Sequence, residues 1–142
     1  MDTKQYLNQI SRLDLMIKNK ITELSTLREM CYGLSAIPNE ERVQSTPNFD
    51  KIGTVVSKLD GLERSIDSLV DEFIDKRTKI ISQIDSMEDE SMYNVLFARY
   101  VEKKTFEKIS DEMNYSFKQT TRIHGNALRE FEKRFGEEYI NL

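Results

Sequence analysis

The chain has 142 residues, a length that suits one ordinary domain or two small modules. Hydrophobic residues make up 38% and charged residues 32%, with five Gly, two Pro and no Trp. This balance is too apolar for a disordered chain and too charged for a membrane protein, so no membrane partner is expected. Cys31 is the single cysteine, which excludes an internal disulfide and fits the reducing cytoplasm.

The scarcity of Gly and Pro, together with apolar residues spaced three and four apart, predicts an all-α fold. A first helix is expected over 3–32 and a longer one over 50–87, with 33–48 as a linker because it holds both prolines. The apolar positions are Ile10, Leu13, Ile17, Leu24, Leu27 and Cys31 in the first helix, and Ile52, Val55, Leu59, Leu62, Ile66, Leu69 and Phe73 in the second. This heptad spacing predicts that residues 1–88 form a long coiled-coil hairpin through which the chain makes a homo-oligomer.

Residues 89–142 are expected to form a separate trihelical module. Thr105 and Ser116 each stand where a helix N-cap is needed, and Asn114 stands at a sharp turn because Asn tolerates the left-handed conformation. Gly136 is the expected end of the last helix. The three predicted helices span 91–103, 105–113 and 116–135.

The charge of the chain is unevenly distributed. The net charge is −4, but residues 1–90 carry −5 and residues 91–142 carry +1. Within 114–134 the balance is +3. A basic segment inside an acidic chain indicates an anionic partner for that segment alone, and double-stranded DNA is the first candidate.

The last two predicted helices have the spacing of a helix-turn-helix, in which the second helix enters the major groove of DNA. Any amphipathic helix pair with a short turn shows the same spacing, so a helix pair that only packs and binds no DNA is the alternative. The basic charge of the segment favours DNA binding. The outward side chains expected to read bases are Phe117, Lys118, Gln119, Thr121 and Arg122. Those expected to contact phosphates are Ser116, Arg129, Lys133 and Arg134.

The segments VLFARY (95–100) and TFEKISDEMNYSFKQTTRIHGNALREF (105–131) resemble region 4 of bacterial primary sigma factors. The matching residues are Leu96, Arg99, Tyr100, Thr105, Glu107, Ile109, Ile123, Ala127, Leu128, Arg129 and Phe131. The resemblance covers about a third of the chain and implies that Phe117, Lys118, Thr121 and Arg122 occupy the promoter-reading positions. Their side chains differ from those of sigma factors, so the same promoter hexamer is not implied.

A coiled-coil segment before such a module resembles the small late-gene transcription regulators of phages and prophages of Gram-positive bacteria, the ArpU-type and related groups. The sequence therefore predicts a sequence-specific DNA-binding transcription regulator in the cytoplasm of a bacterial host cell. One alternative is a DNA-recognition subunit for phage DNA packaging, similar to a small terminase. Another is a coiled-coil adaptor that binds RNA polymerase.

Catalytic and metal-binding functions are not expected. His124 is the single histidine, so a metal cluster or a histidine-dependent triad lacks its residues, and the sequence contains no glycine-rich phosphate loop. His124 itself is expected to be a surface or packing residue, with a phosphate contact as the less favoured alternative. The chain is predicted to be no enzyme and to need no cofactor and no metal.

Overall fold

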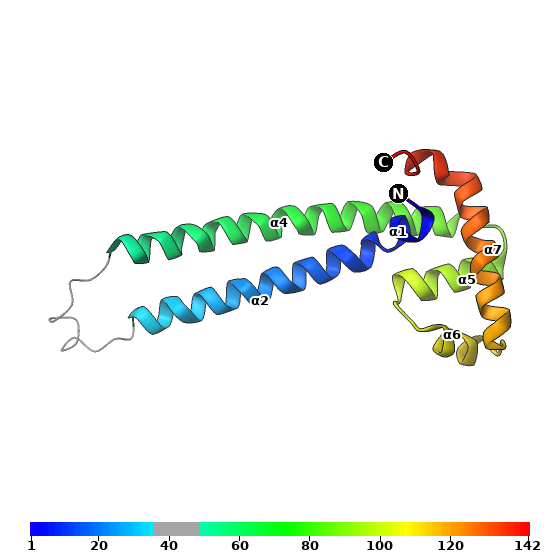
Figure 1. Cartoon of the computed structure of the whole chain (residues 1–142), viewed down its shortest axis with the longest axis horizontal. Coiled ribbons are helices and arrows are strands. Elements are labelled where there is room, and N and C mark those ends of the chain that lie inside the picture. The colour runs from blue at the N-terminus through cyan, green and yellow to red at the C-terminus, as the bar shows by residue number, and fades with distance from the viewer. Residues whose placement is uncertain (36–48) are drawn as a thin grey trace. The chain divides into compact units, whose positions relative to one another are not determined.

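The computed structural model describes residues 1–35 and 49–142 (Figure 1). Over these residues the chain is helical and contains no strand, which confirms the all-α prediction. Most of the predicted linker, residues 36–48, lies outside the described residues. Within the described part, no helix combines the length and the apolar character needed to cross a membrane.

The helices follow the predicted order, with one additional break near the N-terminus. They are α1 (Thr3–Leu7), α2 (Gln9–Ser35), α4 (Phe49–Asp85), α5 (Glu90–Leu96), α6 (Phe106–Met113) and α7 (Phe117–Phe135). A π-helical turn, Phe97–Val101, follows α5, and a 3-10 turn, Gly136–Glu138, follows α7. The predicted first helix is therefore two helices, because a separate short helix begins at an Asp2 cap and ends at Asn8.

The contacts divide the chain into two compact units at places other than residue 88. The first unit contains Met1–Asp14 and Phe73–Leu142, and the second contains Leu15–Glu72. The predicted split into 1–88 and 89–142 thus differs from the observed division. The reason is that α1, the start of α2 and the end of α4 contribute apolar side chains to the same core as α7.

The core of the first unit joins segments that are far apart in the sequence. Its buried members are Tyr6, Leu7, Ile10, Ile80, Ile84, Met87, Leu96, Tyr100, Ala127, Phe131 and Tyr139. The ring of Tyr6 stacks on that of Tyr139 at 4.2 Å between centroids, and the Tyr139 hydroxyl lies 2.8 Å from Thr3 Oγ1. The Tyr6 hydroxyl donates to Gln83 Oε1 at 2.7 Å, so this buried polar residue of α4 is paired.

In the second unit, Leu15–Ser35 of α2 and Phe49–Glu72 of α4 run antiparallel (Figure 1). Of the predicted apolar positions here, Leu24 is buried and most others are half-buried. An exposed ion pair between Arg28 and Glu63, 2.7 Å long, links the two segments. Several large apolar side chains remain exposed: Leu15, Met16, Ile21, Met30, Tyr32, Ile52 and Val56.

The predicted local signals around α6 and α7 are confirmed. Thr105 Oγ1 accepts a hydrogen bond from the Lys108 amide at 3.2 Å, and Ser116 Oγ accepts one from the Gln119 amide at 3.0 Å. Asn114 ends α6 in the left-handed conformation, with φ of 57°. These features fix where α7 begins, because its N-cap follows only two residues after the left-handed turn.

Truncating Leu7 tests whether α1 is part of the first unit's core. Leu7 is fully buried, so Leu7→Ala is expected to lower the free energy of unfolding by about 2–5 kcal/mol. Leu142→Ala is a matched control, because Leu142 is 86% exposed and its truncation should change stability little. Urea denaturation of the three proteins makes the comparison. Equal stability of Leu7→Ala and the unsubstituted chain would show that α1 is not needed by the core.

Candidate nucleic-acid interface

A chain of hydroxyl groups joins α6 to the beginning of α7. The buried Ser110 Oγ donates to the fully buried Thr120 Oγ1 at 2.8 Å, and Thr120 Oγ1 donates to the Ser116 carbonyl at 3.1 Å. Small side chains at this contact let the two helices approach closely. Because both hydroxyls are buried and paired, they fix the angle at which α7 leaves the turn without leaving an unsatisfied polar group.

His124 lies on the inner face of α7 and is 7% exposed. Its Nε2 is 2.7 Å from the Tyr100 hydroxyl, and its ring lies steeply inclined to that of Phe106, with 4.9 Å between centroids. Burial, with smaller contributions from nearby positive charges, lowers the pKa of His124 to about 4. Burial likewise raises the pKa of Tyr100 to about 12. His124 is therefore a neutral packing residue, and the less favoured alternative of a phosphate contact is wrong.

The segment before α6 is held by basic residues that the sequence analysis left without a role. The Arg99 guanidinium lies 4.4 Å above the Phe106 ring and donates to the Lys104 carbonyl at 3.0 Å. Lys103 takes a left-handed conformation, φ 59°, and pairs with Asp14 of α2. Lys104 pairs with Glu112 of α6 at 2.6 Å. These cations make contacts within the first unit. No feature of the sequence distinguishes them from the exposed cations of α7.

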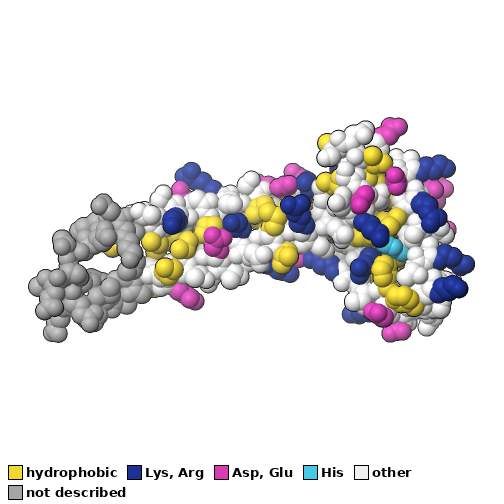
Figure 2. All heavy atoms as spheres, in the orientation of Figure 1, with side chains coloured by type: hydrophobic (Ala, Val, Ile, Leu, Met, Phe, Trp, Pro, Cys, Tyr) yellow, Lys and Arg dark blue, Asp and Glu magenta, His cyan; other side chains and the backbone are white. Residues whose placement is uncertain are grey.

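The structure brings the predicted base-reading residues together. Four of them, together with Ser116, line one surface hollow at the start of α7: Lys118, Gln119, Thr121 and Arg122. No carboxylate lines this hollow. The fifth residue, Phe117, is 52% exposed and does not line the hollow; its ring contacts that of Phe106 in α6. Lys and Arg side chains lie at the surface of the first unit, with Asp and Glu side chains among them (Figure 2). The arrangement can donate several hydrogen bonds to an anionic partner.

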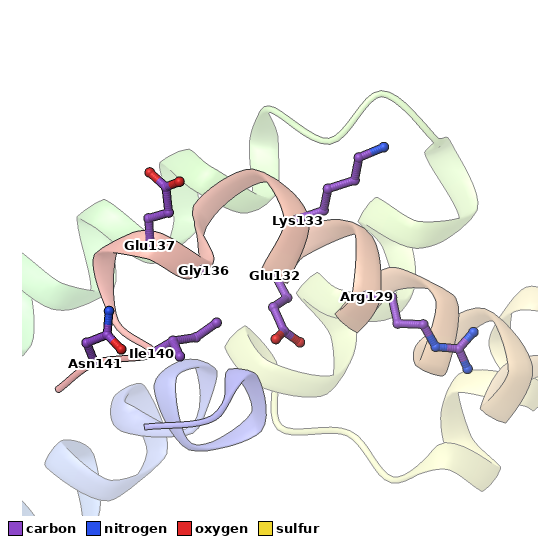
Figure 3. Close-up of a pocket in the computed structure, with 7 residues that line it drawn as sticks. All are labelled: Arg129, Glu132, Lys133, Gly136, Glu137, Ile140 and Asn141. Atoms are coloured by element: carbon purple, nitrogen blue, oxygen red, sulfur yellow. The ribbon is translucent and has the colours of Figure 1, made fainter.

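Two of the predicted phosphate-binding residues, Arg129 and Lys133, lie farther along α7. Both line a second hollow together with Glu132, Gly136 and Glu137 (Figure 3). Figure 3 shows Glu132 on a different side of α7 from Lys133. The two cations are exposed, so each can reach a partner, but carboxylates stand near Lys133 and reduce the local positive potential.

Arg134 has a structural contact that its place in the sequence did not disclose. Its Nη1 donates to the Ser86 carbonyl at 2.7 Å, and its guanidinium lies 5.5 Å from the Phe135 ring centroid. The hollow that it lines is acidic, with Glu88, Asp89 and Glu130. Arg134 thus ties the end of α4 to α7, and the structure does not group it with Arg129 and Lys133.

Comparison with known proteins places the chain in a family. Residues 40–132, about two thirds of the chain, match the model of a protein of unknown function, DUF1492. The chain belongs to the DUF1492 family. No curated protein and no solved structure matches it. The DUF1492 match includes α5, α6 and most of α7, and it ends one residue before Lys133.

The same DUF1492 chain offers no arrangement of metal ligands among its described residues. No three His, Cys, Asp or Glu side chains there are grouped so that they could hold a metal ion. The side chains that gather at the surface of α7 are instead cations, amides and hydroxyls. Their chemistry is that of hydrogen bonding to phosphate oxygens and base edges.

The buried His124 predicts a specific dependence of stability on pH. Its pKa falls from 6.5 when unfolded to about 4 when folded, so the unfolded chain binds a proton first as the pH decreases. The free energy of unfolding should therefore fall by about 1–3 kcal/mol between pH 6.5 and pH 4 from this group alone. His124→Gln removes the titration and keeps an acceptor for Tyr100. Stability curves that stay parallel for both proteins across this range would contradict the assignment.

Proposed function

We propose that this DUF1492 protein is a sequence-specific DNA-binding transcription regulator whose helix α7 reads the major groove. The observation that carries the proposal is the hollow at the start of α7, lined by Lys118, Gln119, Thr121 and Arg122 without a carboxylate. Long donors at the N-terminal end of a helix that follows a tight turn are typical of a helix-turn-helix recognition helix.

Two further features support DNA as the partner. Residues 114–134 carry +3 in a chain of net charge −4, so a DNA duplex would be attracted to this segment in particular. The resemblance of segments 95–100 and 105–131 to sigma factor region 4 points to promoter DNA. The architecture, similar to that of ArpU-type regulators, makes phage late genes the proposed target and the host cytoplasm the proposed location.

The residues of α7 divide into two proposed roles. Arg122 lies on the outer face near the start of the helix, where its planar fork can bond guanine at two atoms. Arg129 and Lys133 are two to three turns further on, where only the phosphate backbone is within reach. Ser116 can add a phosphate contact through its hydroxyl hydrogen. Arg134 is the weakest member of the phosphate set because its guanidinium is engaged by Ser86.

Base reading and phosphate binding are separated by comparing Arg122→Ala with Lys133→Ala. Arg122→Ala should lose about 1–3 kcal/mol of discrimination between the best site and one single-base variant. Lys133→Ala should weaken binding to all sequences alike. Contacts with roughly four phosphates give a slope of about −3.6 for the logarithm of the binding constant against the logarithm of the salt concentration, and loss of one contact should make this slope shallower by about one unit. Competition binding at several salt concentrations measures both. If Arg122→Ala weakens every sequence equally, Arg122 is a phosphate contact and the placement of α7 is wrong.

The exposed apolar side chains of the second unit lead us to propose self-association of the chain through its hairpin. Val56 of α4 is 55% exposed, and Ile52, four residues earlier, is 44% exposed, so two neighbouring apolar side chains on one side of this helix face solvent. Burying such a surface in a second copy removes it from water. The heptad spacing of apolar residues in the two long helices points the same way.

Sedimentation of the full chain at micromolar concentration is expected to show a dimer or a larger homo-oligomer. Val56→Glu places a charge in the apolar face and should shift the equilibrium toward monomer. Ser57→Glu adds the same charge at the neighbouring exposed position and is the matched control. A monomer throughout the micromolar range would contradict the proposal. A ring of eight or more subunits would favour a DNA-packaging subunit instead.

The remaining alternative is an adaptor that binds RNA polymerase, and it predicts different binding properties. It requires retention by RNA polymerase in the absence of DNA, and it does not require Arg122 to discriminate between bases. The clustering of Gln119 and Arg122 in one hollow favours the DNA reading, because amide and guanidinium groups together match base edges.

A further inference from the structure

Phe117 is a large apolar side chain that is exposed at the start of α7. It is the first residue of α7, directly after the Ser116 cap, and its side chain is 52% exposed. The next residue in the chain is Lys118, and Arg122 follows just over one turn later. An isolated exposed apolar residue is common on proteins. Phe117 does not itself line the basic hollow, but it stands in the chain between Ser116 and Lys118, which both do.

The ring of Phe117 rests on a supported neighbour. It meets Phe106 edge-to-face, with centroids 6.4 Å apart and planes at 90°. Phe106 is itself held between the Arg99 guanidinium, 4.4 Å from its centroid, and the His124 ring at 4.9 Å. Phe117 is therefore packed on one side against Phe106, while about half of its surface stays in solvent. Such a preorganised aromatic surface loses little side-chain entropy when a partner covers it.

The chemistry of the ring restricts what it can recognise. A phenyl group neither donates nor accepts a conventional hydrogen bond, so it gains nothing from the hydrogen-bonding edges of the bases. The major groove displays one apolar group, the C5-methyl of thymine. Phosphate oxygens offer no apolar contact, and a contact with a deoxyribose would carry no sequence preference. The neighbouring cations supply the charge complementarity that brings a duplex to this surface.

Resting on the DNA-binding function proposed above, we propose that Phe117 is a specificity-determining residue that contacts the 5-methyl group of a thymine. The thymine lies beside the bases contacted by Lys118 and Arg122, because these three residues occupy the first turn and a half of α7. Phe117 thus adds an apolar selection for thymine to the polar selection made by its neighbours.

Replacing thymine by deoxyuridine tests this contact, because the two bases differ only by the methyl group. Preferred sites are first selected from a random duplex library with the full chain. Each thymine of a selected site is then replaced singly by deoxyuridine, and both affinities are measured. At one thymine per bound module the loss should be about fourfold, the factor that one buried methyl group is worth.

The variants Phe117→Ala and Phe117→Leu assign the loss to this residue. With Phe117→Ala the ratio of thymine to deoxyuridine affinity at that position should fall to about one. Phe117→Leu keeps an apolar side chain and should retain most of the ratio. The ratio compares two DNAs with one protein sample, so a partly unfolded variant does not distort it.

The outcomes separate this inference from the function on which it rests. If the library yields preferred sites but no thymine is sensitive to removal of its methyl group, the Phe117 contact is overturned and the DNA-binding function stands. A sensitive thymine whose ratio is unchanged in Phe117→Ala also overturns the contact, since another residue makes it. If no sequence is enriched at any salt concentration, both proposals fail together.

Discussion

The stacked pair of Tyr6 and Tyr139 is the contact on which the first unit depends. It joins the first helix of the chain to the turn after α7, while the Tyr6 hydroxyl reaches Gln83 of α4. Gln83 in turn donates to Glu138 at 3.1 Å, so three distant segments share one network. The stacked rings bury apolar area, and the hydrogen bonds pair the two tyrosine hydroxyls and the Gln83 side chain. Hydrogen bonds have a required geometry, so together with the stacking they specify one arrangement of these segments.

Helix α7 is built into this core along one side and into the contact with α6 at its beginning. Its C-terminal half contributes Ala127 and Phe131 to the core shared with Tyr6 and Tyr139. Its N-terminal half is positioned by Ser110 and by the neutral His124. The helix is thus anchored at both ends, and its outer face is left for hydrogen-bonding side chains. Because His124 stays neutral well below pH 6.5, the charge of this helix does not vary around neutral pH.

Much of the fold could be predicted from local signals, whereas the long-range contacts could not. Helix caps and the left-handed turn depend on neighbouring residues, so Thr105, Asn114 and Ser116 were identified from spacing alone. The division into units depends on pairs separated by more than 70 residues, such as Tyr6 and Gln83, which leave no periodic signal. For the same reason the role of Arg134 at Ser86 was missed. The outward direction of Lys118, Gln119, Thr121 and Arg122, by contrast, follows from the period of α7 alone.

The separation of the two faces of α7 determines which amino-acid substitutions the helix tolerates. Lys118, Gln119 and Arg122 lie in the surface hollow, whereas Thr120, His124 and Ala127 supply the packing, so the two sets share no member. Substitutions in the first set alter the hydrogen bonds presented to a partner and leave the interior unchanged. New recognition preferences can therefore arise, by mutation or by design, without a compensating stabilising change elsewhere in the chain.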